Sequence, residues 1–141
     1  MKRARIKIAG HSTTAELKKE IQALVRGVVI RRDGTCILRD IRHCDDPVLQ
    51  ADHLVTRANS ATFSDTRLIV CLCRSCHGWK HYHKEQYDAL VRTLLPKERV
   101  KLWDKAMEDS WMPKRVGASD WRMEIVALKQ ELGTYPHGLK S

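Results

Sequence analysis

The sequence has no apolar run long enough to span a membrane, no internal repeat and no low-complexity segment. We therefore expect neither a membrane partner nor a repeat architecture. It also opens without the apolar leader of a secretory signal, and its cysteines number five, which leaves one over from any set of disulfides. A chain of 141 residues can bury a core without disulfides. These absences predict a cytoplasmic protein, the host cytoplasm if a phage encodes it, whose thiols bind metal.

Acidic residues are in short supply. The chain has 26 Lys and Arg against 17 Asp and Glu, a net charge of +9, and an isoelectric point near 9.6. Such a balance favours a polyanionic partner. Nucleic acid is the first candidate; an anionic membrane surface is the second and is not among the partners that we expect.

The chain divides into three sections that we expect to form one compact domain: 1–34, 35–84 and 85–141. The first is a basic arm and then a helix, which begins at the capping box of Thr13 and Glu16 and ends at the turn of Asp33 and Gly34. The last section predicts two or three helices. Their expected features are a start at Pro96, an N-cap at Ser119, a C-cap at Gly133, and an apolar face of Tyr87, Leu90, Val91 and Leu94.

The middle section holds all five cysteines and five of the seven histidines. Residues 47–55 and 66–73 are rich in β-branched and apolar side chains and predict two strands around a polar loop. Residues 74–90 can continue as a helix. The fold class is therefore α+β, with the order strand, loop, strand, helix.

Two cysteines lie at the end of the second predicted strand. Cys73 and Cys76 form a C-x-x-C knuckle, a spacing that lets two thiolates reach one tetrahedral Zn²⁺. Upstream, Cys36 and Cys44 are eight residues apart, so the loop between them must fold back to complete the site. His43 is an alternative to Cys44 as the fourth ligand.

Two other interpretations of the cysteines stay open. Cys71 lies two residues before Cys73 on a strand, and it fits a small core residue better than a fifth ligand. The thiols could also be buried without any metal.

A structural knuckle does not need histidines, yet His77 and His81 follow it at a spacing that places both on one helix face. Asp52 and His53 end the first predicted strand. A carboxylate and imidazoles suit a divalent metal open to water, and a further histidine can act as general base. Adjacent strand residues point to opposite faces, so Asp52 and His53 serve one site only where the strand twists or ends.

The stretch "ADHLVTRANSATFSDTRLIVCLCRSCHGWK", residues 51–80, resembles the HNH (ββα-metal) endonucleases. It is most similar to their zinc-stapled phage forms, such as recombination endonuclease VII. The resemblance implies a ββα-metal core with a structural zinc, flanked here by an N-terminal helix and two or three C-terminal helices.

The resemblance also implies roles for the site residues. Asp52 and His77 would hold the catalytic divalent metal (Mg, Mn, Ni or Zn), with His81 as a further ligand. His53 would be the general base. The four ligands of the structural zinc would be Cys36, Cys44, Cys73 and Cys76.

One family residue is missing. The asparagine expected five residues before the knuckle is Leu68, and Asn59 in the inter-strand loop is the nearest substitute. In the family that asparagine braces the loop opposite the general base. We therefore expect Asn59 or a backbone carbonyl to orient the imidazole of His53.

The implied activity is metal-dependent hydrolysis of DNA phosphodiester bonds, nicking or structure-selective, in phage recombination or packaging. Arg57, Arg67, Lys80 and His83 are candidate phosphate contacts. The implied partners are DNA and a phage packaging or recombination protein. Two alternatives stay open: a catalytically silent zinc-stapled DNA-binding module, and an assembly factor whose nuclease needs a partner.

Overall fold

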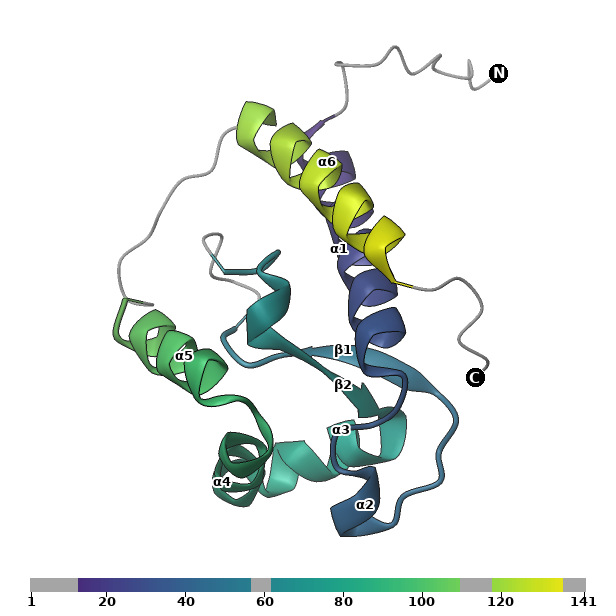
Figure 1. Ribbon diagram of the computed structural model, residues 1–141, viewed down its shortest axis with the longest axis vertical. Coiled ribbons are helices and arrows are strands. Elements are labelled where there is room, and N and C mark those ends of the chain that lie inside the picture. Colours follow the sequence, from purple (N-terminus) through teal and green to yellow (C-terminus); the bar gives the residue numbers. More distant parts are fainter. Residues whose placement is uncertain (1–12, 57–61, 110–117, 136–141) are drawn as a thin grey trace.

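The computed structural model describes residues 13–56, 62–109 and 118–135 (Figure 1). Within these ranges the chain forms helices around one two-stranded antiparallel sheet, a mixed α+β arrangement. The elements are α1 (Thr14–Asp33), α2 (Arg39–Arg42), β1 (Leu49–His53), the 3₁₀ turn η1 (Thr66–Leu68), β2 (Ile69–Cys73), α3 (Arg74–Tyr82), α4 (Lys84–Leu94), α5 (Lys97–Asp109) and α6 (Ala118–Thr134). No helix in these ranges has both the length and the apolarity needed to span a bilayer.

Both predicted ends of α1 are confirmed. The Thr13 hydroxyl accepts a hydrogen bond from the backbone N–H of Glu16 at 3.2 Å, which satisfies one of the unpaired donors of the first turn. At the other end Gly34 adopts the left-handed conformation, with φ at 70°, and its N–H donates to the carbonyl of Ile30. Local sequence alone therefore sets the length of this helix.

The two strands pair antiparallel, with Asp52 opposite Val70 and His53 opposite Ile69. Every residue of β2 is buried, because both faces of the small sheet are covered. Ile69 and Cys71 pack into a core with α1 and α6, whereas Val70 packs into a second core with α4 and α5. The hairpin is thus a middle layer between two cores.

Figure 1 shows α1 and α6 side by side on one side of the hairpin, and α2, α3 and α4 on the other. The predicted C-terminal extension, 85–141, therefore contributes to both cores. Tyr87 and Trp103 are buried in the core that contains Cys73 and Cys76, whereas Trp121 is buried in the core with α1.

Polar contacts attach α1 to the hairpin. Arg32 donates to the carbonyl oxygens of Thr66 and Ile69, both at 2.7 Å. Its neighbour Asp33 accepts from the backbone N–H of Cys71 at 3.1 Å. These contacts fix the C-terminal end of α1 over β2.

Four details of the predicted helices were wrong. The helix expected over 74–90 is broken at His83, whose backbone (φ −134°, ψ 44°) is not helical. Ser119 and Gly133 are not caps, because α6 begins at Ala118 and contains Gly133, which lacks the positive φ of a glycine cap. Leu94 is 41% exposed, since the chain leaves the helix at Leu95 and buries that side chain instead.

Candidate metal centre and adjoining groove

Four cysteines from distant parts of the chain meet at one point. The Sγ atoms of Cys36, Cys44, Cys73 and Cys76 all lie within 4.8 Å of one another, and all four thiols are free. A tetrahedral zinc with bonds of about 2.3 Å needs sulfurs about 3.8 Å apart, which a small inward movement supplies. The cluster could therefore hold a structural metal ion, and four thiolates are the donor set that zinc prefers.

The fourth side chain of the cluster is Cys44 and not His43. His43 ends α2 in the left-handed conformation, with φ at 50°, and its side chain is exposed. This turn directs the next residue, Cys44, back toward the knuckle. The loop between Cys36 and Cys44 thus folds over as the sequence requires.

The knuckle joins β2 to α3. Cys73 is the N-cap of α3, and its sulfur accepts from the backbone N–H of Cys76 at 3.4 Å. Both side chains are fully buried. A metal held here would connect the hairpin, α3 and the α2 loop.

Two arginines of α2 lie beside the thiols. Arg42 donates from Nη1 to the sulfur of Cys76 at 3.2 Å. Hydrogen bonding to Cys44 raises the pKa of Arg39. Burial opposes ionisation of Cys44, but hydrogen bonds from Arg39 and the neighbouring thiols outweigh it and lower the pKa of Cys44. The two guanidinium groups place positive charge where thiolates would bring negative charge to a metal.

Cys71 lies outside the cluster. Its side chain belongs to the core on the other face of the sheet, where burial raises the pKa of the thiol to about 12. Its interpretation as a core residue is confirmed.

Asp52, near the end of β1, is 5% exposed and accepts three hydrogen bonds from Lys80 and Tyr87. The Lys80 ammonium contacts both carboxylate oxygens, at 2.9 and 2.8 Å, and the Tyr87 hydroxyl donates to Oδ2. His77 Nε2 lies 3.7 Å from Oδ1. Burial and the Asp52 charge raise the pKa of Tyr87, so this hydroxyl stays a donor.

The predicted metal ligands of α3 lie next to Asp52. His77 Nδ1 is 2.7 Å from the side-chain oxygen of Gln50, and the rings of His77 and His81 have centroids 5.0 Å apart. In the described ranges, however, only the four cysteines form a set of three or more metal-binding side chains with ligand atoms close together. In this arrangement Lys80 occupies the carboxylate oxygens that a second metal would use.

His53 ends β1, and one of its ring nitrogens lies 2.9 Å from the carbonyl oxygen of Phe63. A carbonyl only accepts, so that nitrogen carries the proton. Asp52 faces α3 and α4 while His53 faces Phe63, yet both line one groove because the strand ends there. Leu68, at the position where the resemblance leads us to expect an asparagine, is 2% exposed in the core.

The groove lies between α1, β1 and α3 and has a volume of about 970 Å³. His53, Asp52, His77 and His81 line it from β1 and α3. The opposite wall is α1, whose contribution sequence reasoning missed, although the cations on the polar face of this helix were a usable signal. The basic residues that line the groove are Lys19, Arg26, Arg31 and Lys80.

The predicted phosphate contacts have different outcomes. Lys80 lines the groove, whereas His83 stacks on the indole of Trp79 with centroids 4.9 Å apart and does not line it. Arg57 and the substitute asparagine, Asn59, lie outside the described residues.

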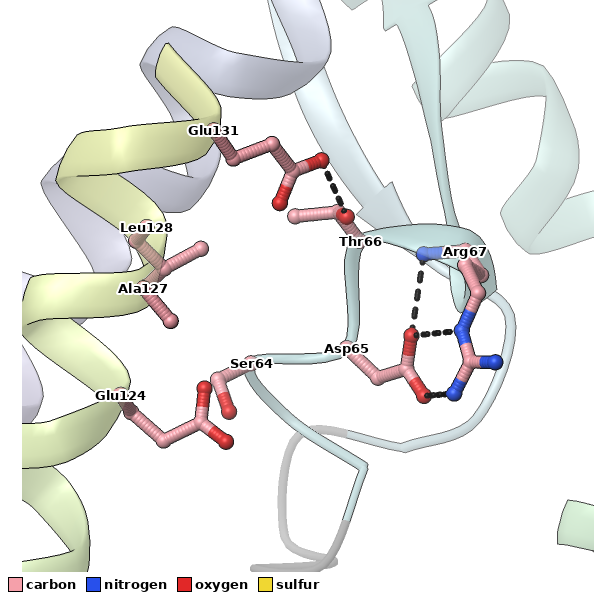
Figure 2. Close-up of a pocket in the computed structure, with 8 residues that line it drawn as sticks. All are labelled: Ser64, Asp65, Thr66, Arg67, Glu124, Ala127, Leu128 and Glu131. Atoms are coloured by element: carbon pink, nitrogen blue, oxygen red, sulfur yellow. Dashed lines mark hydrogen bonds and ion pairs between the residues drawn. The ribbon is translucent and has the colours of Figure 1, made fainter. Parts of the chain in front are cut away.

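Arg67 lies away from the groove. It forms an ion pair with Asp65 at 2.8 Å, next to a pocket between α6 and residues 64–67 (Figure 2). Glu124 and Glu131 also line that pocket, and Glu131 accepts from the Thr66 hydroxyl at 2.8 Å. The negative charge of the three carboxylates in its lining, Asp65, Glu124 and Glu131, disfavours phosphate binding in this pocket.

No protein-family model, curated protein or solved structure matches the chain.

Proposed function

We propose that this protein is a metal-dependent DNA endonuclease of the HNH type, nicking or structure-selective. One observation carries the proposal: a single groove is lined by His53, Asp52 and His77 together with four basic side chains, next to a four-cysteine cluster that could hold zinc. A base, groups that can bind a divalent metal, and cations in one groove are what metal-assisted hydrolysis of a phosphodiester requires. The order β1, β2, α3 with the knuckle at the β2–α3 junction supports the proposal.

His53 is the general base. The Phe63 carbonyl accepts from one ring nitrogen and so holds the ring in one tautomer and orientation. The other nitrogen then takes a proton from the attacking water.

Asp52 and His77 offer a carboxylate oxygen and an imidazole nitrogen, which suit a divalent ion, with His81 as a further donor. Such an ion supplies charge stabilisation at the scissile phosphate and the leaving oxygen. Lys80 contacts both Asp52 oxygens, so binding of an ion there would displace its ammonium, and a phosphate in the groove that Lys80 lines would be its new partner.

The test is a cleavage assay on supercoiled, linear and branched DNA with Mg²⁺, Mn²⁺ or Ni²⁺, with EDTA as the metal-free control. His53→Ala should lower the cleavage rate by about two to four orders of magnitude, with DNA affinity close to wild type. His43→Asn is the matched control, because His43 is exposed and asparagine tolerates its left-handed backbone. Absence of cleavage by the zinc-loaded protein on all three substrates contradicts the proposal.

The second candidate is a catalytically silent DNA-binding module that acts in phage recombination or packaging. It is favoured by Lys80, which pairs with both Asp52 oxygens, and by Leu68, which cannot replace an asparagine. This candidate predicts DNA binding with no metal-dependent cutting.

A further inference from the structure

Helix α1 forms one whole wall of the groove, although this helix is not part of the implied ββα nuclease core. Lys19, Arg26 and Arg31 line the groove from this helix, facing the side that carries His53 and His77. The first and last of these cations are twelve helical positions apart, a length of about 18 Å. The positive charge on this wall therefore extends over several nucleotides of a strand.

Arg31 carries the most specific signal on this wall. Its Nη1 atom is buried and has no hydrogen-bond partner within the described part of the chain. An unsatisfied buried donor costs about 1–3 kcal/mol, and more for a charged group. Since the side chain lines the groove, an anion bound there would supply the missing acceptor.

Arg26 adds a second guanidinium to this wall. It is an exposed side chain, and Nη2 contacts the Leu49 carbonyl at 3.4 Å, the long end of the hydrogen-bond range. A phosphate oxygen would be a stronger, charge-assisted acceptor. Arginine forks bind phosphate in a bidentate manner, so two of the three cations suit this ligand.

The groove lining also lacks what base recognition uses. Among the described residues that line it, the only side chains with rings are His53, His77 and His81, with no Phe, Tyr or Trp. Stacking platforms for bases are built from such aromatic residues. The lining therefore fits a sugar-phosphate backbone better than exposed bases.

We infer that α1 is the strand-binding wall of the groove: Lys19, Arg26 and Arg31 bind phosphates of one DNA strand and hold it against β1 and α3, independent of base sequence. The inference rests on the proposed function for the identity of the polyanion. It adds to that function the location of the strand and the residues that bind it.

The test compares two sets of variants that remove the same charge. The groove variant is Lys19→Gln, Arg26→Gln and Arg31→Gln combined. The control is Lys101→Gln, Lys105→Gln and Lys129→Gln combined, because the first two line a separate pocket on α5 and the third, on α6, pairs with Glu20. Both proteins are first checked for wild-type circular dichroism and zinc content.

Affinity for a fluorescein-labelled DNA hairpin is measured by anisotropy between about 50 and 200 mM salt, without added divalent ion. The groove variant should bind at least 100-fold more weakly, and its salt slope should fall by about 0.9 for each phosphate that it no longer neutralises. The control should stay within about threefold of wild type, and exchanging the hairpin sequence should change neither result. The inference is overturned if the groove variant binds DNA with wild-type affinity, or if the control variant loses as much DNA affinity as the groove variant.

Failure of the two proposals is distinguishable. If the groove variant loses affinity but the wild-type protein never cuts, α1 binds DNA and the nuclease assignment is wrong. If the wild-type protein cuts while the groove variant keeps both affinity and salt slope, the nuclease assignment holds and the inference about α1 is wrong.

Discussion

At the scale of single residues, the Asp52 carboxylate is the most constrained polar group of the groove. It is 5% exposed, its counter-ion Lys80 has a side chain only 12% exposed, and Tyr87 donates a third hydrogen bond. Taking these charges out of water is costly, and their mutual contacts offset that cost only while all partners are present. The cluster therefore ties α3 and α4 to the end of β1.

Lys80→Met should lower the free energy of unfolding by about 3–5 kcal/mol, because it leaves a buried carboxylate without its cation. Urea unfolding of the zinc-loaded protein measures the change. Lys84→Met is the control, since Lys84 pairs with Asp88 on the exposed face of α4 and should cost less than about 1 kcal/mol. Equal effects of the two variants would show that the Asp52 pair is not buried in solution.

Arg42 makes the most specific prediction at the cysteine cluster. It donates to Cys76 at 3.2 Å, and its guanidinium stacks 4.3 Å above the ring centroid of Trp79. In the zinc-loaded protein Arg42→Ala should speed the release of zinc to a chelator by about 10- to 100-fold, because it removes a hydrogen bond to a thiol that would bind the metal. Arg74→Ala is the control, since Arg74 pairs with Asp46 at 3.3 Å. Identical release rates for both variants would remove any role for the guanidinium.

At the scale of elements, the knuckle connects the hairpin to α3. Cys76→Ser should abolish the binding of about one zinc per chain and unfold α3 and the α2 loop, because binding free energy at such a site is also folding free energy. Elemental analysis and circular dichroism measure both changes.

Cys71→Ala is the matched control for this prediction. Cys71 is equally buried on β2, but it belongs to the other core. It should therefore keep the zinc while losing some stability. Two outcomes would contradict a structural metal at the four cysteines. One is loss of zinc in both Cys76→Ser and Cys71→Ala, and the other is a wild-type protein that binds no zinc.

At the scale of the whole molecule, the hairpin separates two cores that share only the sheet. Trp121 of α6 is 1% exposed and packs edge-on against Phe63, with centroids 5.2 Å apart. The four clustered cysteines are in the other core or pack against it. Damage to one core should therefore leave the chemistry of the other intact.

Trp121→Ala should lower the free energy of unfolding by about 3–5 kcal/mol through the cavity it leaves, while zinc content stays at the wild-type value. Met123→Ala on the same helix is the control, because Met123 is 70% exposed and should change stability by less than about 0.5 kcal/mol. Loss of zinc in Trp121→Ala would mean that the two cores unfold as one unit.

Sequence by itself determined the features that depend on neighbouring residues. The capping box at Thr13, the glycine cap at Gly34 and the knuckle of Cys73 and Cys76 follow from hydrogen bonds that a backbone N–H donates to an acceptor only three or four positions away. The two strands followed from β-branched, apolar composition. Local sequence did not predict the break between α3 and α4 at His83. The break accompanies the packing of Tyr87 into the core, and this packing depends on distant residues.

Only the tertiary structure decided what depends on distant residues. The choice of Cys44 over His43 required the left-handed turn at the end of α2, which brings a loop back over the knuckle. The Lys80 pair with Asp52 joins positions 28 apart, and α1 became a wall of the groove through contacts of Arg32 and Asp33 with β2. Such contacts arise because burial of apolar faces brings segments together regardless of their separation in sequence, and that packing determines which polar groups meet.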